Sequence, residues 1–200
     1  MPTTSTTSWT KPWLGLAVTV FAVLGVISSI ALLQSELKLL RDPDAALVCD
    51  VNPLIGCSKS LLAPQAHLLV IPNSAVGLIL FGALAAFGLV LMFRAGLPRL
   101  IWWGVAAGAV GGLLFVSYFL YESIAVFRTL CPYCMLTWAA TLAIVPLAIG
   151  GAASSGALGR GAQGFGRTTL KFWWAITLIF YLVVVLIVVI ALSDKIGYLF

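Results

Sequence analysis

Long uncharged stretches alternate with short charged ones along the chain, and this pattern predicts five membrane-spanning helices. Each stretch holds about 20 residues, which is enough to cross a hydrocarbon core of about 30 Å at 1.5 Å per residue. The fold class is therefore an all-α integral membrane protein with one domain over residues 13–192. The predicted spans are residues 13–33, 74–93, 100–121, 131–153 and 172–192.

The segments between the spans differ in composition. Residues 1–12 are a polar tail and residues 193–200 a short tail on the other side of the membrane. Residues 154–171, rich in Gly, Ala and Ser, are expected to be a flexible linker. Residues 34–73 form a long loop with seven charged residues. Its second half, residues 60–71, is apolar but too short to span the membrane, so we expect a surface helix or a capping half-helix.

Glycines in the third span recur every four residues, at Gly104, Gly108 and Gly112. Because small residues at this spacing let helices approach closely, they predict a helix-packing face.

Composition supports a membrane protein: 62% of the residues are hydrophobic, 8% are charged and the mean hydropathy is +1.14. The 11 basic residues are scattered instead of forming a stripe, which argues against nucleic acid as a partner. If the N-terminus is cytoplasmic, the inner segments hold six cations and no acid, and the outer segments hold the other five cations and all six acids. The positive-inside rule therefore predicts a cytoplasmic N-terminus. The inner cations are Lys11, Arg94, Arg99, Arg160, Arg167 and Lys171.

This orientation places all four cysteines on the outer side, where the compartment is oxidising. Cys49 and Cys57 lie in the long loop, and Cys131 and Cys134 lie at the start of the fourth span. Residues 49–57 cannot be one helix that joins its ends, since eight steps cover about 12 Å, beyond the reach of a disulfide.

The Cys131-Pro132-Tyr133-Cys134 sequence places two thiols at a helix start. The partial positive charge of a helix N-terminus favours the thiolate, which is the reactive form. Pro132 suits the first helical position because its missing N–H has no helical partner there.

Four interpretations of these cysteines compete. Two structural disulfides are one. A structural zinc site is another, but 73 residues between Cys57 and Cys131 do not match a usual module. A c-type haem needs a histidine after Cys134, where Met135 stands. The fourth is a dithiol relay, in which one pair meets a soluble partner and the other a membrane electron carrier, and the reactive pair at a helix start favours it.

Three motifs together resemble the vitamin K epoxide reductase family, in its bacterial disulfide-forming branch, and we expect the form without a fused thioredoxin domain. The resemblance covers roughly residues 49–138. The motifs are Cys49-Asp50-Val51 followed by Cys57, then Pro72-Asn73-Ser74 with Gly77, and then Cys131-x-x-Cys134.

The resemblance implies a four-helix bundle around a quinone site, closed by the capping half-helix, in a multi-pass protein of a bacterial plasma membrane. It implies that a thioredoxin-fold (DsbA-like) extracytoplasmic protein passes electrons to Cys49 and Cys57. Cys131 and Cys134 then pass them to menaquinone or ubiquinone, with no metal. The function so implied is a membrane thiol oxidase and quinone reductase, with its active site on the outer face, that supports disulfide formation in secreted proteins.

Two further residues receive roles from the resemblance. The Asn73 amide would donate a hydrogen bond to a quinone carbonyl, although a plain helix cap is the alternative. Trp138, one turn beyond Cys134, would line the quinone site. Vertebrate relatives carry Tyr at that position, which weakens any inference of epoxide reduction.

Two other positions are less informative. Leu62 and Ala63 stand where family members usually carry Ser, and His67 is interpreted as an interfacial residue. The alternative functions are vitamin K epoxide or quinone reduction as such, and a non-enzymatic membrane protein with structural disulfides.

Overall fold

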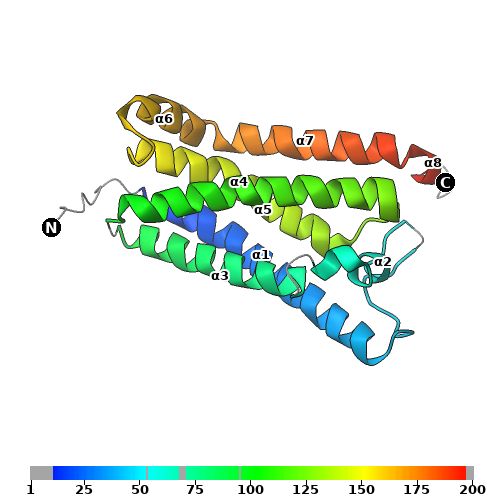
Figure 1. Cartoon of the computed structure of the whole chain (residues 1–200). Coiled ribbons are helices and arrows are strands. Elements are labelled where there is room, and N and C mark those ends of the chain that lie inside the picture. Colours follow the sequence, from blue (N-terminus) through cyan, green and yellow to red (C-terminus); the bar gives the residue numbers. More distant parts are fainter. Residues whose placement is uncertain (1–10, 53, 68–70, 95, 197–200) are drawn as a thin grey trace.

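The computed structural model describes residues 11–52, 54–67, 71–94 and 96–196 (Figure 1). Within them, five helices are long and apolar enough to cross a membrane, so the predicted all-α membrane fold with five spans is confirmed. Most of the N-terminal tail (residues 1–10) and the last four residues of the C-terminal tail lie outside the described residues. The spanning helices are α1 (Pro12–Arg41), α3 (Asn73–Met92), α4 (Arg99–Tyr121), α5 (Pro132–Ser154) and α7 (Trp173–Ala191).

Helices α1 and α5 form the centre of the packing. Helix α1 packs against α3 and α5, and α4 and α7 pack against α5. The α1–α3 contact is close because Gly15 faces the other backbone: a Cβ at Gly15 would lie 2.6 Å from the carbonyl oxygen of Gly88. The predicted glycine face of the third span is wrong at Gly104 and Gly108, where an added Cβ meets nothing within 4 Å. Gly104 and Gly108 therefore lie on a face of α4 that does not contact another helix.

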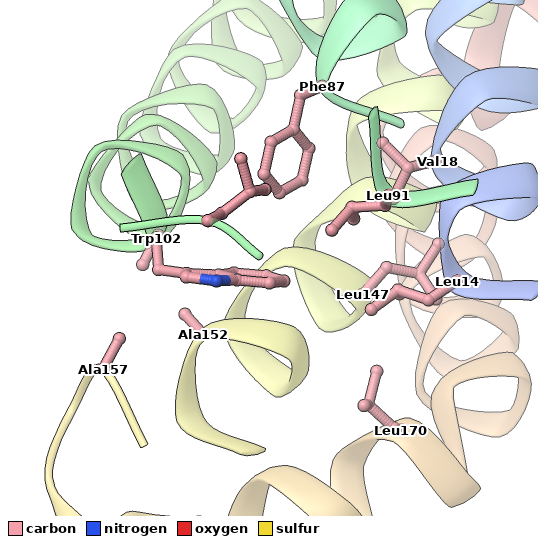
Figure 2. Close-up of a cluster of buried hydrophobic side chains, with 11 residues drawn as sticks. Leu14, Val18, Phe87, Leu91, Trp102, Leu147, Ala152, Ala157 and Leu170 are labelled. Atoms are coloured by element: carbon pink, nitrogen blue, oxygen red, sulfur yellow. The ribbon is translucent and has the colours of Figure 1, made fainter. Parts of the chain in front are cut away.

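The end of the bundle opposite the cysteines has a core around Trp102 (Figure 2). The Trp102 indole is buried and meets Phe87 of α3 edge-on, with 5.3 Å between ring centroids. Leu170 belongs to the same core, and it lies in α6 (Gln163–Lys171), which packs against α5. The predicted flexible linker is therefore wrong, because the buried Leu170 side chain fixes a helix within it.

Helix α1 is longer than predicted. It continues through residues 34–41, which contain no Pro or Gly, so the long loop begins at Asp42 instead of Gln34. Lys38 and Arg41 occupy its last turn, where cations interact favourably with the helix dipole.

Helix α4 also continues beyond its predicted end. A π-helical turn, η2 (Glu122–Phe127), extends it and ends at Arg128, whose φ of 50° is left-handed. The capping segment, expected as one half-helix over residues 60–71, forms two short turns, α2 (Ser58–Leu61) and η1 (Pro64–His67), and residues 68–70 lie outside the described residues. Pro64 separates the turns because it has no N–H to continue α2. A short helix, α8 (Ser193–Ile196), follows α7.

Candidate redox site at the cysteine end

The loop cysteines form a disulfide. Cys49 and Cys57 are bonded, with 5.8 Å between their Cα atoms, and both are buried. Asn52 organises the fold-back, since its Oδ1 accepts hydrogen bonds from the backbone N–H groups of Leu54 (2.9 Å) and Ile55 (2.8 Å). An Asn side chain that bonds the backbone two and three residues on is a turn-forming device.

A single parallel β-bridge ties this loop to the segment before α5. The Leu130 N–H donates to the Leu54 carbonyl (2.8 Å), and the Gly56 N–H donates to the Leu130 carbonyl (3.0 Å). Leu192, at the end of α7 and fully buried, packs with Leu54 and Leu130. Because Cys57 follows Gly56 and Cys131 follows Leu130, the bridge brings these two cysteines together.

The two cysteine pairs meet at Cys57 and Cys131, whose sulfur atoms lie 3.2 Å apart. Cys131 is the N-cap of α5, with Pro132 at the first helical position as predicted, and its sulfur accepts from the Cys134 N–H at 3.4 Å. The hydrogen bond from the Cys134 side chain, with help from the amides of Cys134 and Tyr133, holds the pKa of the Cys131 thiol below its ordinary value, although burial opposes this. A thiolate at Cys131 is positioned to attack the loop disulfide.

Asp50 holds the loop beside these sulfurs. Its Oδ1 accepts from the backbone N–H groups of Cys57 (2.6 Å) and Ser58 (3.2 Å), and its Oδ2 accepts from the Ser58 hydroxyl. Burial raises the pKa of Asp50, but these donors outweigh it and bring that pKa below its usual value. Asp50 received no role from the sequence, where its place next to Cys49 in the family motif was the available signal.

Cys134 differs from the other three cysteines in exposure. Cys49, Cys57 and Cys131 are buried, whereas Cys134 is only half-buried. It packs against a second buried cluster, in which Trp138 is 5% exposed and lies with Val116 and Leu120 of α4. Cys134 therefore borders both the sulfur cluster and the apolar cluster around Trp138.

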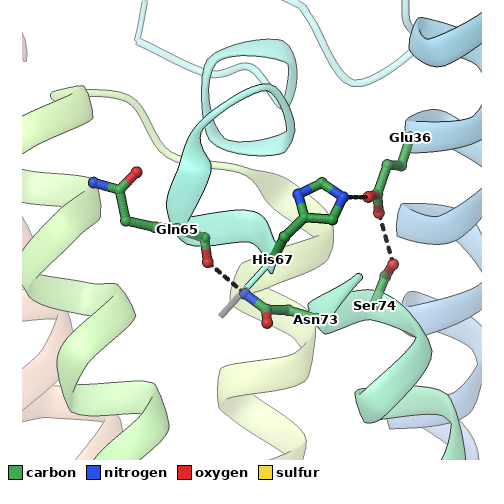
Figure 3. Close-up of polar contacts among 5 residues, drawn as sticks. All are labelled: Glu36, Gln65, His67, Asn73 and Ser74. Carbon is green, nitrogen blue, oxygen red and sulfur yellow. Dashed lines mark hydrogen bonds and ion pairs between the residues drawn. The ribbon is translucent and has the colours of Figure 1, made fainter. Parts of the chain in front are cut away.

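Asn73 is the first residue of α3, and Pro72 stands at the cap position, so the helix-cap interpretation of Asn73 is wrong. Its side-chain N–H donates instead to the Gln65 carbonyl of the capping segment at 2.7 Å (Figure 3). An amide NH₂ has two N–H donors, and this bond occupies one of them. The capping segment is thus held against the start of α3.

A buried carboxylate links the end of α1 to η1 and to the start of α3. Glu36 of α1 is 3% exposed; its Oε1 lies 2.9 Å from Nε2 of His67, and its Oε2 accepts from the Ser74 hydroxyl at 2.8 Å (Figure 3). Glu36 received no role from the sequence, and Ser74 appeared there only as part of a motif, because only the folded chain brings α1, η1 and α3 together here. The one signal was an acidic residue one turn past an apolar span.

Among the described residues, no group of three or more His, Cys, Asp or Glu side chains is arranged to hold a metal ion. The fold and the site define a multi-pass membrane protein with two cysteine pairs in contact at one end of its bundle. Residues 16–149, two thirds of the chain, match the model of the vitamin K epoxide reductase family. The chain therefore belongs to this family, and it is a membrane oxidoreductase of a quinone-linked class.

Proposed function

We propose that this protein is a thiol oxidase and quinone reductase that passes electrons from a thioredoxin-fold protein through both cysteine pairs to a quinone. The observation that carries the proposal is the 3.2 Å contact between the sulfurs of Cys57 and Cys131, which joins the two pairs into one path. Structural disulfides alone give no reason for a free cysteine to lie against a disulfide.

Two exchange steps move the electron pair within the chain. A reduced Cys57 attacks Cys131 of a Cys131–Cys134 disulfide, and Cys134 leaves as a thiolate. Cys49 then attacks Cys57 in this mixed disulfide, and Cys131 leaves as a thiolate. The products are a Cys49–Cys57 disulfide and two free cysteines at the start of α5, Cys131 and Cys134, which is the arrangement of the structure.

The residues next to Cys134 fit a quinone. Such a ring accepts two electrons and two protons when it is bound. The half-buried Cys134 is the sulfur that a membrane-borne acceptor reaches most easily, Trp138 provides an apolar side, and the second N–H of Asn73 suits a ring carbonyl. The buried Gln65 Oε1 has no hydrogen-bond partner, as expected for a polar group beside a ligand site. Menaquinone and ubiquinone are the candidates.

The surface next to the loop disulfide suits a protein partner. A shallow pocket of about 320 Å³ is lined by residues on both sides of the disulfide, among them Asp50, Gly56 and Ser58. Val48 and Val51, which flank Cys49, are 91% and 69% exposed. A DsbA-like thioredoxin-fold protein docked here would have to displace the loop, since Cys49 itself is only 4% exposed.

The charge distribution supports an outer-face site in a bacterial plasma membrane. Arg94, Arg99 and Lys171 adjoin the helix ends opposite the cysteines, and positive residues favour the cytoplasmic side. The cysteine end then faces the compartment where secreted proteins acquire disulfides.

Quinone reduction by the purified full-length chain tests the proposal. A reduced thioredoxin-fold protein serves as donor and a short-chain quinone as acceptor. We expect turnover by the natural chain and its loss in Cys134→Ser, with vitamin K epoxide consumed more slowly than plain quinone. Unchanged quinone reduction by Cys134→Ser contradicts the mechanism, and no turnover by the natural chain favours the non-enzymatic alternative.

A further inference from the structure

Helix α7 ends in a buried residue at the cysteine end of the bundle (Figure 1). Among the described residues of α7 itself, only Thr177 is buried, and it lies near the opposite end of the helix. Leu192, the C-cap of α7, is fully buried. A helix that is otherwise largely exposed thus places one side chain inside the protein beside the cysteines.

Leu192 contacts the two segments that carry Cys57 and Cys131. It forms a cluster with Leu54 and Leu130, both of which are buried. Leu130 directly precedes Cys131, and its N–H donates to the Leu54 carbonyl at 2.8 Å. Leu192 therefore packs against both segments that bring the two sulfurs to 3.2 Å.

The β-bridge between these segments is small. It pairs Ile55 with Leu130, through the hydrogen bonds from Leu130 to Leu54 and from Gly56 to Leu130. Even a complete two-stranded hairpin is only marginally stable in water, so a pairing as short as this one needs packing to persist. Leu192 supplies buried apolar contact at this point.

An ion pair fastens the same end of the chain. Asp194 of α8 pairs with Arg128, which lies two residues before Leu130. Both side chains are exposed, so the pair stabilises the fold little by itself. It nevertheless connects the segment after Leu192 to the segment before Cys131.

We propose that Leu192 is a positioning residue for disulfide exchange between Cys57 and Cys131. It acts through Leu54 and Leu130, against which it packs. The inference rests on the proposed function, because exchange between the two cysteine pairs is a step of that function. It adds the element that aligns the sulfurs.

Alignment matters because the exchange involves three sulfurs. When Cys57 attacks as a thiolate, the Cys57–Cys131 bond forms and the Cys131–Cys134 bond breaks. Cys134 leaves as a thiolate with the electron pair of the broken bond. A small displacement of reacting groups can slow such a step strongly, so the packing of Leu192 controls how often the two sulfurs meet.

The alternative is a purely structural role, in which Leu192 only stabilises the fold. Leu170→Ala is the matched control, since Leu170 is also a buried leucine but belongs to the core at the opposite end of the bundle. Both substitutions, Leu192→Ala and Leu170→Ala, should lower the midpoint of thermal unfolding. Only Leu192→Ala should change the encounter of the two sulfurs.

The experiment uses the full-length chain with Cys49→Ala and Cys134→Ala in lipid nanodiscs, so that Cys57 and Cys131 are the remaining cysteines. The chain is equilibrated in buffers with set ratios of reduced to oxidised glutathione, then acid-quenched and analysed by mass spectrometry. The fraction of Cys57–Cys131 disulfide gives the effective concentration of one thiol at the other.

We expect Leu192→Ala to lower this effective concentration about tenfold, and Leu170→Ala to change it less than about twofold. Leu192→Met, which nearly keeps the side-chain volume, should restore most of the loss. Asp194→Asn should lower the effective concentration by up to about threefold, and high salt should remove that difference.

A second measurement isolates the quinone step. In the variant Cys49→Ala, Cys57→Ala, dithiothreitol can reduce the Cys131–Cys134 disulfide directly, and a short-chain quinone accepts the electrons. Adding Leu192→Ala should leave this rate unchanged, because the loop cysteines take no part. A slower rate would mean that Leu192 acts on the quinone step instead, which overturns the inference.

The outcomes distinguish the two proposals. An unchanged effective concentration in Leu192→Ala, or an equal loss in Leu170→Ala, overturns the positioning role. If Leu192→Ala does not fold, Leu192→Val decides, with an expected loss of about threefold. If the natural chain reduces no quinone while Leu192→Ala still shows the tenfold loss, the proposed function fails and the positioning role is upheld.

Discussion

The sulfur of Cys131 lies 3.2 Å from the sulfur of Cys57, although 73 residues separate them in the sequence. A disulfide bond is about 2.05 Å long, so closing the remaining distance takes a movement of about 1 Å. The β-bridge between Ile55 and Leu130 holds both backbones in place. Disulfide exchange at this point therefore needs little rearrangement of the fold.

We expect the double variant Cys49→Ala, Cys134→Ala to form a Cys57–Cys131 disulfide under mild oxidation in nearly all molecules. Each remaining cysteine then has the other as its nearest sulfur. Non-reducing electrophoresis and peptide mass spectrometry measure the product. The control, Cys49→Ala with Cys131→Ala, leaves Cys57 and Cys134 and should cross-link more slowly. Equal rates in the two variants would contradict the observed pairing.

The lowered pKa of Cys131 predicts how this reaction depends on pH. The thiolate fraction rises as pH increases through the pKa, so a lowered pKa keeps the reaction fast at lower pH. Since the Cys134 side chain is the main cause, adding Cys134→Ala to Cys49→Ala should move the rise in rate to higher pH. Quenched time courses of Cys57–Cys131 disulfide formation, with a small-molecule disulfide as oxidant, give the rate as a function of pH for both variants. Coincident profiles would rule out this cause.

Asp50 predicts acid sensitivity of the loop. Because its pKa is lowered in the folded protein, the stabilisation it provides is present above the unfolded value near 4 and is lost as pH falls through the folded value. At neutral pH, Asp50→Asn should speed reduction of the Cys49–Cys57 disulfide by a phosphine roughly three- to tenfold. The expected effect is modest because water screens the hydrogen bonds of the partly exposed Asp50 carboxylate. The difference from the natural chain should vanish below the folded pKa. Asp44→Asn is the control and should leave the rate of reduction unchanged. If Asp50→Asn and the natural chain differ equally at every pH, the Asp50 carboxylate is not the cause of the stabilisation.

The sequence predicted the five spans because hydrophobic length is a local property, and it predicted the helix-start cysteines because capping is local too. It failed where contacts between distant segments decide. Nothing near Leu170 in the sequence indicates that this residue is buried against α5, so its segment resembled a linker. Glu36 likewise finds its partners only when η1 and α3 reach α1. Glycine spacing was equally misleading, because spacing does not reveal which face meets a neighbour.

The wrong prediction of a glycine packing face in the third span provides a matched pair of substitutions, Gly15→Ala and Gly104→Ala. Gly15→Ala places a methyl group 2.6 Å from the backbone oxygen of Gly88 and 2.6 Å from the amide nitrogen of Met92, and neither atom can move without shifting α3. Overpacking of this kind costs about 1–3 kcal/mol. Gly104→Ala adds its methyl group where nothing lies within 4 Å, and Ala favours a helix over Gly by about 0.5–1 kcal/mol. Thermal unfolding of the detergent-solubilised chain should therefore show a lower midpoint for Gly15→Ala and an equal or higher midpoint for Gly104→Ala. The reverse order would mean that the third span, and not the α1–α3 contact, is the tightly packed glycine face.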